Sequence, residues 1–126
     1  RAATQATTKM GNHRRAIKQA ESLKHNVQLW AARIGVEPKR VQIQRMTTKW
    51  ASCSTSGRIC LSKDLLREDA SFREVVIVHE LLHLRVPNHG KLFKSLMNAY
   101  LPNWEEKVDG RVSSLCGYHR YNGKEE

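Results

Sequence analysis

Apolar residues in the first third of the chain recur at steps of three and four positions, which places them on one face of a helix. Asn12 is a favourable N-terminal cap and Gly35 a favourable residue after a helix end, so the pattern predicts one long helix over residues 12–34. The Thr- and Ala-rich stretch 1–11 is expected to be flexible. The predicted apolar face consists of Ala16, Ile17, Ala20, Leu23, Val27, Trp30 and Ile34.

The next segment shows the alternation that is typical of half-buried strands. Val41 and Ile43 are each followed by a glutamine, and this pattern predicts a strand over residues 40–48. Residues 50–57 are small, polar and turn-forming. Residues 58–62 again contain alternating apolar positions and predict a second strand. The sequence therefore indicates a small sheet.

A nearly continuous apolar pattern follows in residues 71–86. Val75–Val78 and the leucines beyond them leave little polar surface on any side, as expected of a central, buried helix. Ser71, with Glu74 three positions later, predicts the N-terminal cap of this helix. Pro87 cannot continue a helix, so the helix is expected to end just before it.

Two further helices are predicted after this proline. Asn88 suits the N-terminal cap of the first, which Pro102 interrupts. The second is expected over residues 103–115, followed by a polar tail over residues 116–126. The side chains expected to pack inward from the first of these helices are Phe93, Leu96, Met97 and Tyr100.

The elements and the length together predict an α+β fold, in which a small sheet packs on the helix of residues 71–86 and on two or three further helices. A chain of 126 residues is expected to form a single domain over residues 1–126. The sequence contains neither an apolar run of membrane-spanning length nor a hydrophobic signal segment, so no membrane partner is expected. Its three cysteines form no CxxC pair, which argues against a disulfide framework and favours the cytoplasm.

The net charge of +10 is concentrated in the N-terminal part of the chain. Residues 1–50 contain eleven lysines and arginines but only two acidic residues. Such a basic region attracts polyanions, so residues 9–49 are a candidate surface for nucleic acid. No known nucleic-acid motif accompanies the charge, and a solvated, solubilising face stays an equal alternative.

The segment His-Glu-Leu-Leu-His-Leu-Arg-Val-Pro-Asn-His, which begins at His79, carries the strongest chemical signal. Histidines four positions apart share one helix face, so His79 and His83 are candidate ligands of one Zn²⁺ ion. His89 is a candidate third ligand because the turn at Pro87 brings it back; a straight helix would leave it about 15 Å from the first histidine. Glu80 is the candidate base that takes a proton from a zinc-bound water.

This spacing is seldom accidental. The HExxH pattern arises in roughly 2% of shuffled versions of such a chain, and a further histidine six positions later in about one in a thousand. The alternative is a helix with ordinary, hydrogen-bonded core histidines. Burying polar groups without partners costs several kcal/mol, and a metal ion removes that cost, so the sequence favours a metal site.

Three stretches of the sequence belong together: Trp50-Ala-Ser-Cys-Ser followed by a glycine and a short strand, Val-Val-Ile-Val-His79-Glu-Leu-Leu-His-Leu, and Pro87-Asn-His-Gly with Phe93 after it. They resemble the YgjP-like family of predicted zinc metallopeptidases, in the zincin group and related to SprT- and WLM-type proteases. The resemblance covers residues 14–115. It implies a minimal zincin with a small antiparallel or mixed sheet above two central helices, three histidines on zinc and a catalytic glutamate.

The favoured function is zinc-dependent hydrolysis of peptide bonds in a protein or peptide. The strand of Arg58, Ile59, Cys60 and Leu61 is expected to be a sheet edge on which an extended substrate pairs through its backbone. Two alternatives stay open: hydrolysis of a nucleotide phosphoanhydride by the same site, and a nucleic-acid-associated protease recruited by the basic N-terminal half. A purely structural zinc is disfavoured, because structural sites close with four protein ligands.

Overall fold

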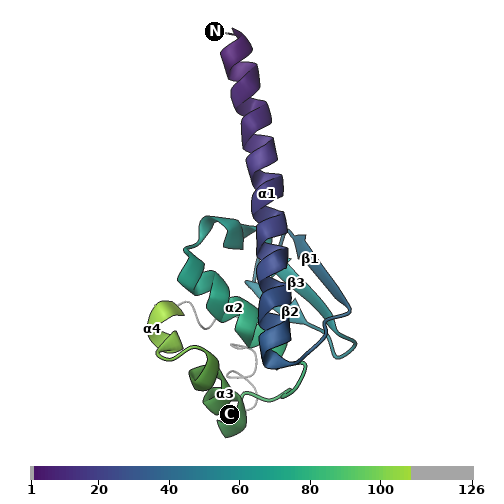
Figure 1. Ribbon diagram of the computed structural model, residues 1–126, viewed down its shortest axis with the longest axis vertical. Coiled ribbons are helices and arrows are strands. Elements are labelled where there is room, and N and C mark those ends of the chain that lie inside the picture. The colour runs from purple at the N-terminus through teal and green to yellow at the C-terminus, as the bar shows by residue number, and fades with distance from the viewer. Residues whose placement is uncertain (1, 109–126) are drawn as a thin grey trace.

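The computed structural model describes residues 2–108, with side chains from residue 14 onward. In this part of the chain, helices pack with a three-stranded sheet (Figure 1). The elements in chain order are α1 (Ala2–Ile34), β1 (Arg40–Gln44), β2 (Ala51–Cys53), β3 (Arg58–Ser62), a 3-10 helix (Lys63–Arg67), α2 (Ala70–Leu82), α3 (Lys91–Tyr100) and α4 (Trp104–Val108). This arrangement confirms the predicted α+β class.

The first helix, α1, has 33 residues and begins at Ala2 rather than at the predicted Asn12. Residues 2–11 contain no proline, so no residue in this stretch prevents the helix from continuing towards the N-terminus. The predicted end is confirmed: Gly35 has a φ of 85°, and its N–H donates to the carbonyl of Ala31 at 2.8 Å. Despite this length, neither α1 nor any other helix of the described residues is apolar enough to cross a membrane.

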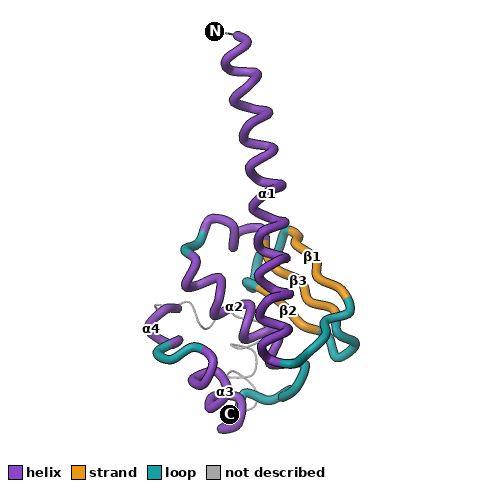
Figure 2. Tube along the Cα trace, in the orientation of Figure 1, coloured by secondary structure: helices purple, strands orange, loops and turns teal. Residues whose placement is uncertain are grey.

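The three strands lie in the order β1-β3-β2 (Figure 2). The sheet is mixed, because β1 is parallel and β2 antiparallel to β3. β3 coincides with the predicted second strand, whereas β1 ends at Gln44, earlier than predicted. β2 was not predicted, because it lies inside the segment expected to turn. The turn itself narrows to residues 54–57, where Gly57 has a φ of 97° and donates its N–H to the carbonyl of Ser54 at 3.0 Å.

β3 is the central strand, so the prediction of a substrate-binding edge at this strand is wrong. Arg58, Ile59, Cys60 and Leu61 all pair with β1, and the last three also pair with β2. Their backbone groups are therefore engaged within the sheet. Ile59 and Leu61 are also 1% and 0% exposed, so their side chains belong to the core. The edge strand that contacts α2 is β2, which is too short to leave a recognisable alternation in the sequence.

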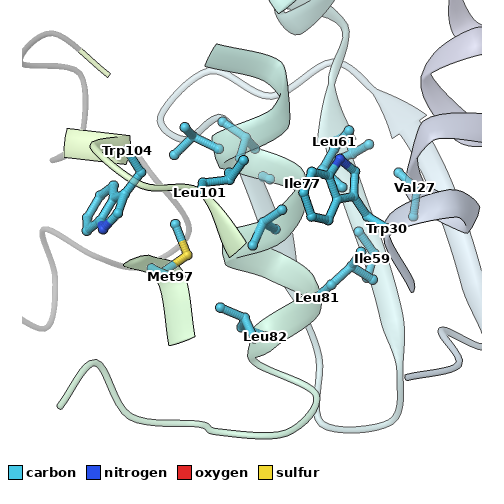
Figure 3. Close-up of a cluster of buried hydrophobic side chains, with 14 of the residues drawn as sticks. Val27, Trp30, Ile59, Leu61, Ile77, Leu81, Leu82, Met97, Leu101 and Trp104 are labelled. Atoms are coloured by element: carbon cyan, nitrogen blue, oxygen red, sulfur yellow. The ribbon is translucent and has the colours of Figure 1, made fainter. Parts of the chain in front are cut away.

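The second helix, α2, lies at the centre of the hydrophobic core, as predicted (Figure 3). Every residue from Val75 to Leu82 is buried. Ile77 faces the side on which Trp30 of α1 lies, whereas Leu82 faces Met97 of α3 (Figure 3). The helix that carries the candidate metal ligands is thus held between α1 and the sheet on one side and the C-terminal helices on the other.

The ends of α2 differ from the prediction at both termini. The helix begins at Ala70 after the extended residue Asp69, in place of the predicted cap Ser71. It ends at Leu82, well before Pro87. The reason is a tightened turn, in which the next three N–H groups donate to carbonyls three positions earlier instead of four.

The loop after α2 is longer than predicted. α3 begins only at Lys91, so Asn88 does not cap it and His89 stands in the preceding loop. The proline marks the turn but not its length, since asparagine and glycine also favour non-helical backbone. α3 ends before Pro102, as predicted. α4 covers the first part of the helix predicted over residues 103–115; the rest of that range and the predicted tail lie outside the described residues.

Candidate metal centre

Three histidines meet at the C-terminal end of α2. His79 lies in the last turn of this helix, His83 directly follows it, and His89 belongs to the loop before α3. The Nε2 atom of His79 lies 3.2 Å from Nε2 of His83 and 3.2 Å from Nε2 of His89. One ligand atom of each residue lies within 4.8 Å of the others. The structure thus brings together the three ligands predicted from the sequence.

The backbone after α2 explains this convergence. His83 keeps helical torsions, with φ −64° and ψ −17°, so its side chain still stacks one turn beyond that of His79. The N–H of Val86 then donates to the carbonyl of Leu82 at 2.7 Å and closes the turn. This turn reverses the chain early enough for His89 to point back at the end of α2.

The turn is also anchored to α1. The Nη1 group of Arg85 donates to the carbonyl of Ile34, the last residue of α1, at 3.1 Å. A cation is favourable at this position, because the free carbonyls at a helix C-terminus carry partial negative charge. The loop that carries His89 is therefore tied to the end of a second helix.

The distances from Nε2 of His79 to Nε2 of His83 and of His89 fit a tetrahedral metal ion. With Zn–N bonds of about 2.0–2.1 Å, two nitrogens of a tetrahedral site lie about 3.3 Å apart, close to the 3.2 Å found here. Hydrogen bonds explain the arrangement less well. The Nε2 atom of His79 has a single in-plane position, for a proton or a lone pair, so it cannot bond to both neighbouring rings. A cation between the three rings satisfies them together.

Burial keeps the three imidazoles in the neutral form that binds metals. Burial, followed by the charges of His83 and His89, holds the pKa of His79 well below its usual value. Burial also lowers the pKa of His83. The pKa of His89 falls to about 4, chiefly through burial and then through the nearby charges of His83 and Lys94. Protons therefore compete weakly for these nitrogens at neutral pH.

A buried carboxylate lies beside the histidines. Glu80 is 0% exposed and follows His79 directly on α2. Burial, the negative charge of Glu80 and then Cys60 raise the pKa of the Cys53 thiol to about 12. Cys53 is therefore a protonated thiol on β2, close enough to the carboxylate to feel its charge, and does not have the reactivity of a nucleophilic cysteine.

Two aromatic residues complete the surroundings. Trp50 packs edge-to-face on Phe72 of α2, with ring centroids 5.0 Å apart. Phe93 of α3 touches the rings of all three histidines, a role that the sequence analysis missed. The available signal was its position four residues after His89, but the same spacing is also typical of any inward-facing residue of an amphipathic helix.

Two solved structures share this fold. The metallopeptidase zymogen of Methanocaldococcus jannaschii jannalysin is 24% identical, with a TM-score of 0.63 over 71% of this chain and 96% of its own. The metallopeptidase zymogen of Pyrococcus abyssi abylysin is 17% identical, with a TM-score of 0.62 over 75% of this chain and 98% of its own. At these identities the likeness concerns the fold, which is that of small metallopeptidases.

The family follows from the sequence. The family model named YgjP-like, metallopeptidase domain, matches residues 3–109. The chain belongs to the YgjP-like metallopeptidase family, which confirms the resemblance seen around Trp50, His79 and Pro87. No curated protein matches the chain.

Proposed function

We propose that this protein is a zinc-dependent peptidase in which His79, His83 and His89 hold one Zn²⁺ ion and Glu80 is the general base. The observation that carries the proposal is the convergence of three histidines, with Nε2 of His79 3.2 Å from Nε2 of each of the other two and with a buried carboxylate next in sequence to His79. Three protein ligands leave one position open, as in catalytic rather than structural zinc sites.

The chemistry of this site divides between the metal and the glutamate. A zinc ion bound here would act as a Lewis acid, which polarises the scissile carbonyl and lowers the pKa of a bound water. Glu80 accepts the proton of the attacking water and later passes it to the nitrogen of the leaving amine. Because the carboxylate is 0% exposed, its interaction with these groups takes place at a lower local dielectric than in bulk water.

We assign the substrate edge to β2, in place of the central strand β3. β2 is the outer strand on this side of the sheet and contacts α2. Its last residue, Cys53, lies near Glu80. An extended peptide that pairs with this edge through its backbone is thereby brought towards the general base, with little demand on its side chains. The substrate class expected from this arrangement is an unfolded or extended polypeptide.

The decisive variant of this proposal is Glu80→Gln. It removes the base but keeps the size of the side chain, so the protein should bind about one zinc per chain while kcat on an unfolded protein substrate falls at least 100-fold. The matched control is Glu74→Gln, since Glu74 lies on the same helix but lines the groove towards α1. His83→Ala should lose most of the zinc, measured by atomic emission on the purified protein.

Two results would contradict the proposal. Full activity of the Glu80→Gln variant would show that Glu80 is not the base, and full zinc content in the His83→Ala variant would remove the metal site. The alternative function, hydrolysis of a nucleotide phosphoanhydride, is tested by measuring turnover of a nucleoside triphosphate with the same proteins. Turnover of the triphosphate but not of the polypeptide would identify a phosphoanhydride hydrolase.

We also propose that α1 attaches the enzyme to double-stranded DNA. Figure 1 shows α1 continuing well beyond the sheet and the other helices. Arg14, Arg15 and Lys18 are exposed in this part, and residues 14–49 contain nine basic but only two acidic residues.

The exposed part of α1 does not resemble a membrane-binding helix. Among the exposed residues 14–19, Ile17 is the only large apolar side chain, whereas helices that bind membranes present a broad apolar face. A single exposed helix also fits the DNA major groove, which is about 12 Å wide.

The salt dependence of DNA binding tests this attachment. Replacing Arg14, Arg15 and Lys18 together by Gln should weaken binding to a fluorescent duplex and reduce the salt slope by up to about three. A control with Lys63, Arg67 and Lys91 replaced by Gln has the same net charge but an unchanged α1, and should keep most of the affinity. Equal weakening in both variants, or wild-type binding to anionic vesicles but not to DNA, would contradict the assignment.

A further inference from the structure

Phe93, in the first turn of α3, contacts all three imidazoles of the metal centre. Its ring centroid lies 5.0 Å from that of His79, 4.8 Å from that of His83 and 5.0 Å from that of His89. The phenyl ring stands nearly edge-on to His79 and His89, at 71° and 81°, and is tilted by 31° against His83. The imidazole centroids are 4.8, 4.9 and 4.6 Å from one another, so the four rings form one compact cluster.

Phe93 joins a third element to this cluster. The histidines come from α2 and the loop after it, whereas Phe93 comes from α3 and is only 2% exposed. One turn further along α3, Met97 is 0% exposed and packs in the hydrophobic core. The place of Phe93 is therefore fixed by the docking of α3, and water has little access to the cluster from the side that the phenyl ring covers.

Contact with three rings at once restricts the histidines. The outer torsion of a histidine side chain has a broad energy profile, so an imidazole without neighbours samples many orientations. A phenyl ring packed against all three removes most of these orientations before a metal ion arrives. Ligands that are held in place by packing lose less conformational freedom on binding, and their affinity is correspondingly higher.

We propose that Phe93 is a positioning residue of the metal centre, whose ring holds the three imidazoles in their metal-binding orientation even in the metal-free protein. The inference rests on the proposed zinc site and adds a hydrocarbon support to it. Phe93 acts through the histidines and has no part of its own in the reaction.

The test compares Phe93→Leu with Met97→Leu. Both variants keep a large buried apolar residue on the same face of α3, but only the first removes a ring from the histidine cluster. Each protein is prepared metal-free, its folding is checked by urea unfolding, and its zinc dissociation constant is measured by competition with a chromophoric chelator. We expect zinc affinity to fall at least tenfold in Phe93→Leu and to stay within twofold of wild type in Met97→Leu.

The outcomes separate this inference from the proposed function. A folded Phe93→Leu protein with zinc affinity within twofold of wild type overturns the positioning role. A wild-type protein that binds no zinc overturns the proposed zinc site itself. If Phe93→Leu does not fold, the wild-type metal-free protein decides by NMR. Nuclear Overhauser effects should connect the Phe93 ring with all three imidazoles, and their absence overturns the inference.

Discussion

The three imidazoles of the metal centre differ in burial although they face the same point. His79 is fully buried within the last turn of α2, whereas His83 and His89 are partly exposed. Depth matters because a buried imidazole resists protonation more strongly than an exposed one. A site of this kind keeps its ligands deprotonated over a wide range of pH but makes the metal-free fold sensitive to acid.

That sensitivity can be measured on His89. Its folded-state pKa of about 4 lies below the ordinary value of 6.5 that the unfolded chain retains, so the unfolded state binds more protons between these values. The metal-free protein should therefore have its full stability above about pH 6.5 and lose part of it progressively as the pH falls towards 4. Urea unfolding of chelator-treated protein at several pH values tests this.

The control for the acid effect is His89→Gln, which removes the titrating group. The variant should lose less stability than wild type between pH 6.5 and 4, whatever its stability at neutral pH. Equal pH dependence of the two proteins would show that the loss arises elsewhere.

Chemistry at the residue scale was the most predictable part of the protein. The four-residue step between His79 and His83, with Glu80 between them, has a direct geometric meaning on a helix. His89 could be added because Pro87 forces a turn. Phe93 could not be added, since a lone phenylalanine at helical spacing is ordinary core material and only the docked helix shows which rings it meets.

At the scale of elements, the tight turn between β2 and β3 lets β2 pair with the central strand and lie beside α2. Gly57 closes this turn with a φ of 97°. A Cβ atom there would lie 3.2 Å from Cγ and 3.3 Å from the backbone nitrogen of Lys39. Gly35 at the end of α1 also has positive φ, but a Cβ atom there would have no neighbour within 4 Å. A side chain at Gly35 would therefore meet backbone strain alone, whereas a side chain at Gly57 would meet backbone strain and a steric clash with Lys39.

Alanine at these glycines should have unequal effects. Gly35→Ala is expected to lower the free energy of unfolding by about 1–2 kcal/mol, the cost of left-handed backbone for an L-residue. Gly57→Ala should cost clearly more, because the backbone of Lys39 must also move. Chemical denaturation of both variants measures the difference, and equal losses would show that the turn yields without strain.

The type of each element was predicted better than the order of the strands in the sheet. The central helix and the second strand were correct because each has a strong pattern of its own. β2 was missed since Ala51–Cys53 is too short to alternate, and the missing strand made β3 look like an edge. Strand order depends on pairing between distant segments, which a local pattern does not encode.

At the scale of the whole molecule, the family model covers residues 3–109, and the fold matches that of small metallopeptidases. The single-domain assignment over residues 1–126, the flexibility of residues 1–11 and the cytoplasmic location stay predictions. The basic N-terminal half was evident from composition. That the first part of α1 would extend beyond the sheet and the other helices was not evident, because the pattern predicts a helix but not which of its turns have neighbours (Figure 1).

The hydrogen bond between Arg85 and the last carbonyl of α1 has a consequence for how this enzyme can be dissected. The loop that carries His89 is hydrogen-bonded to the C-terminal end of α1, the first helix of the chain. A shortened protein that begins after α1 would lose both the acceptor for Arg85 and the apolar side chains of Leu23, Val27 and Trp30. The N-terminal part of α1 extends beyond the fold, whereas its C-terminal part supports the loop that carries His89.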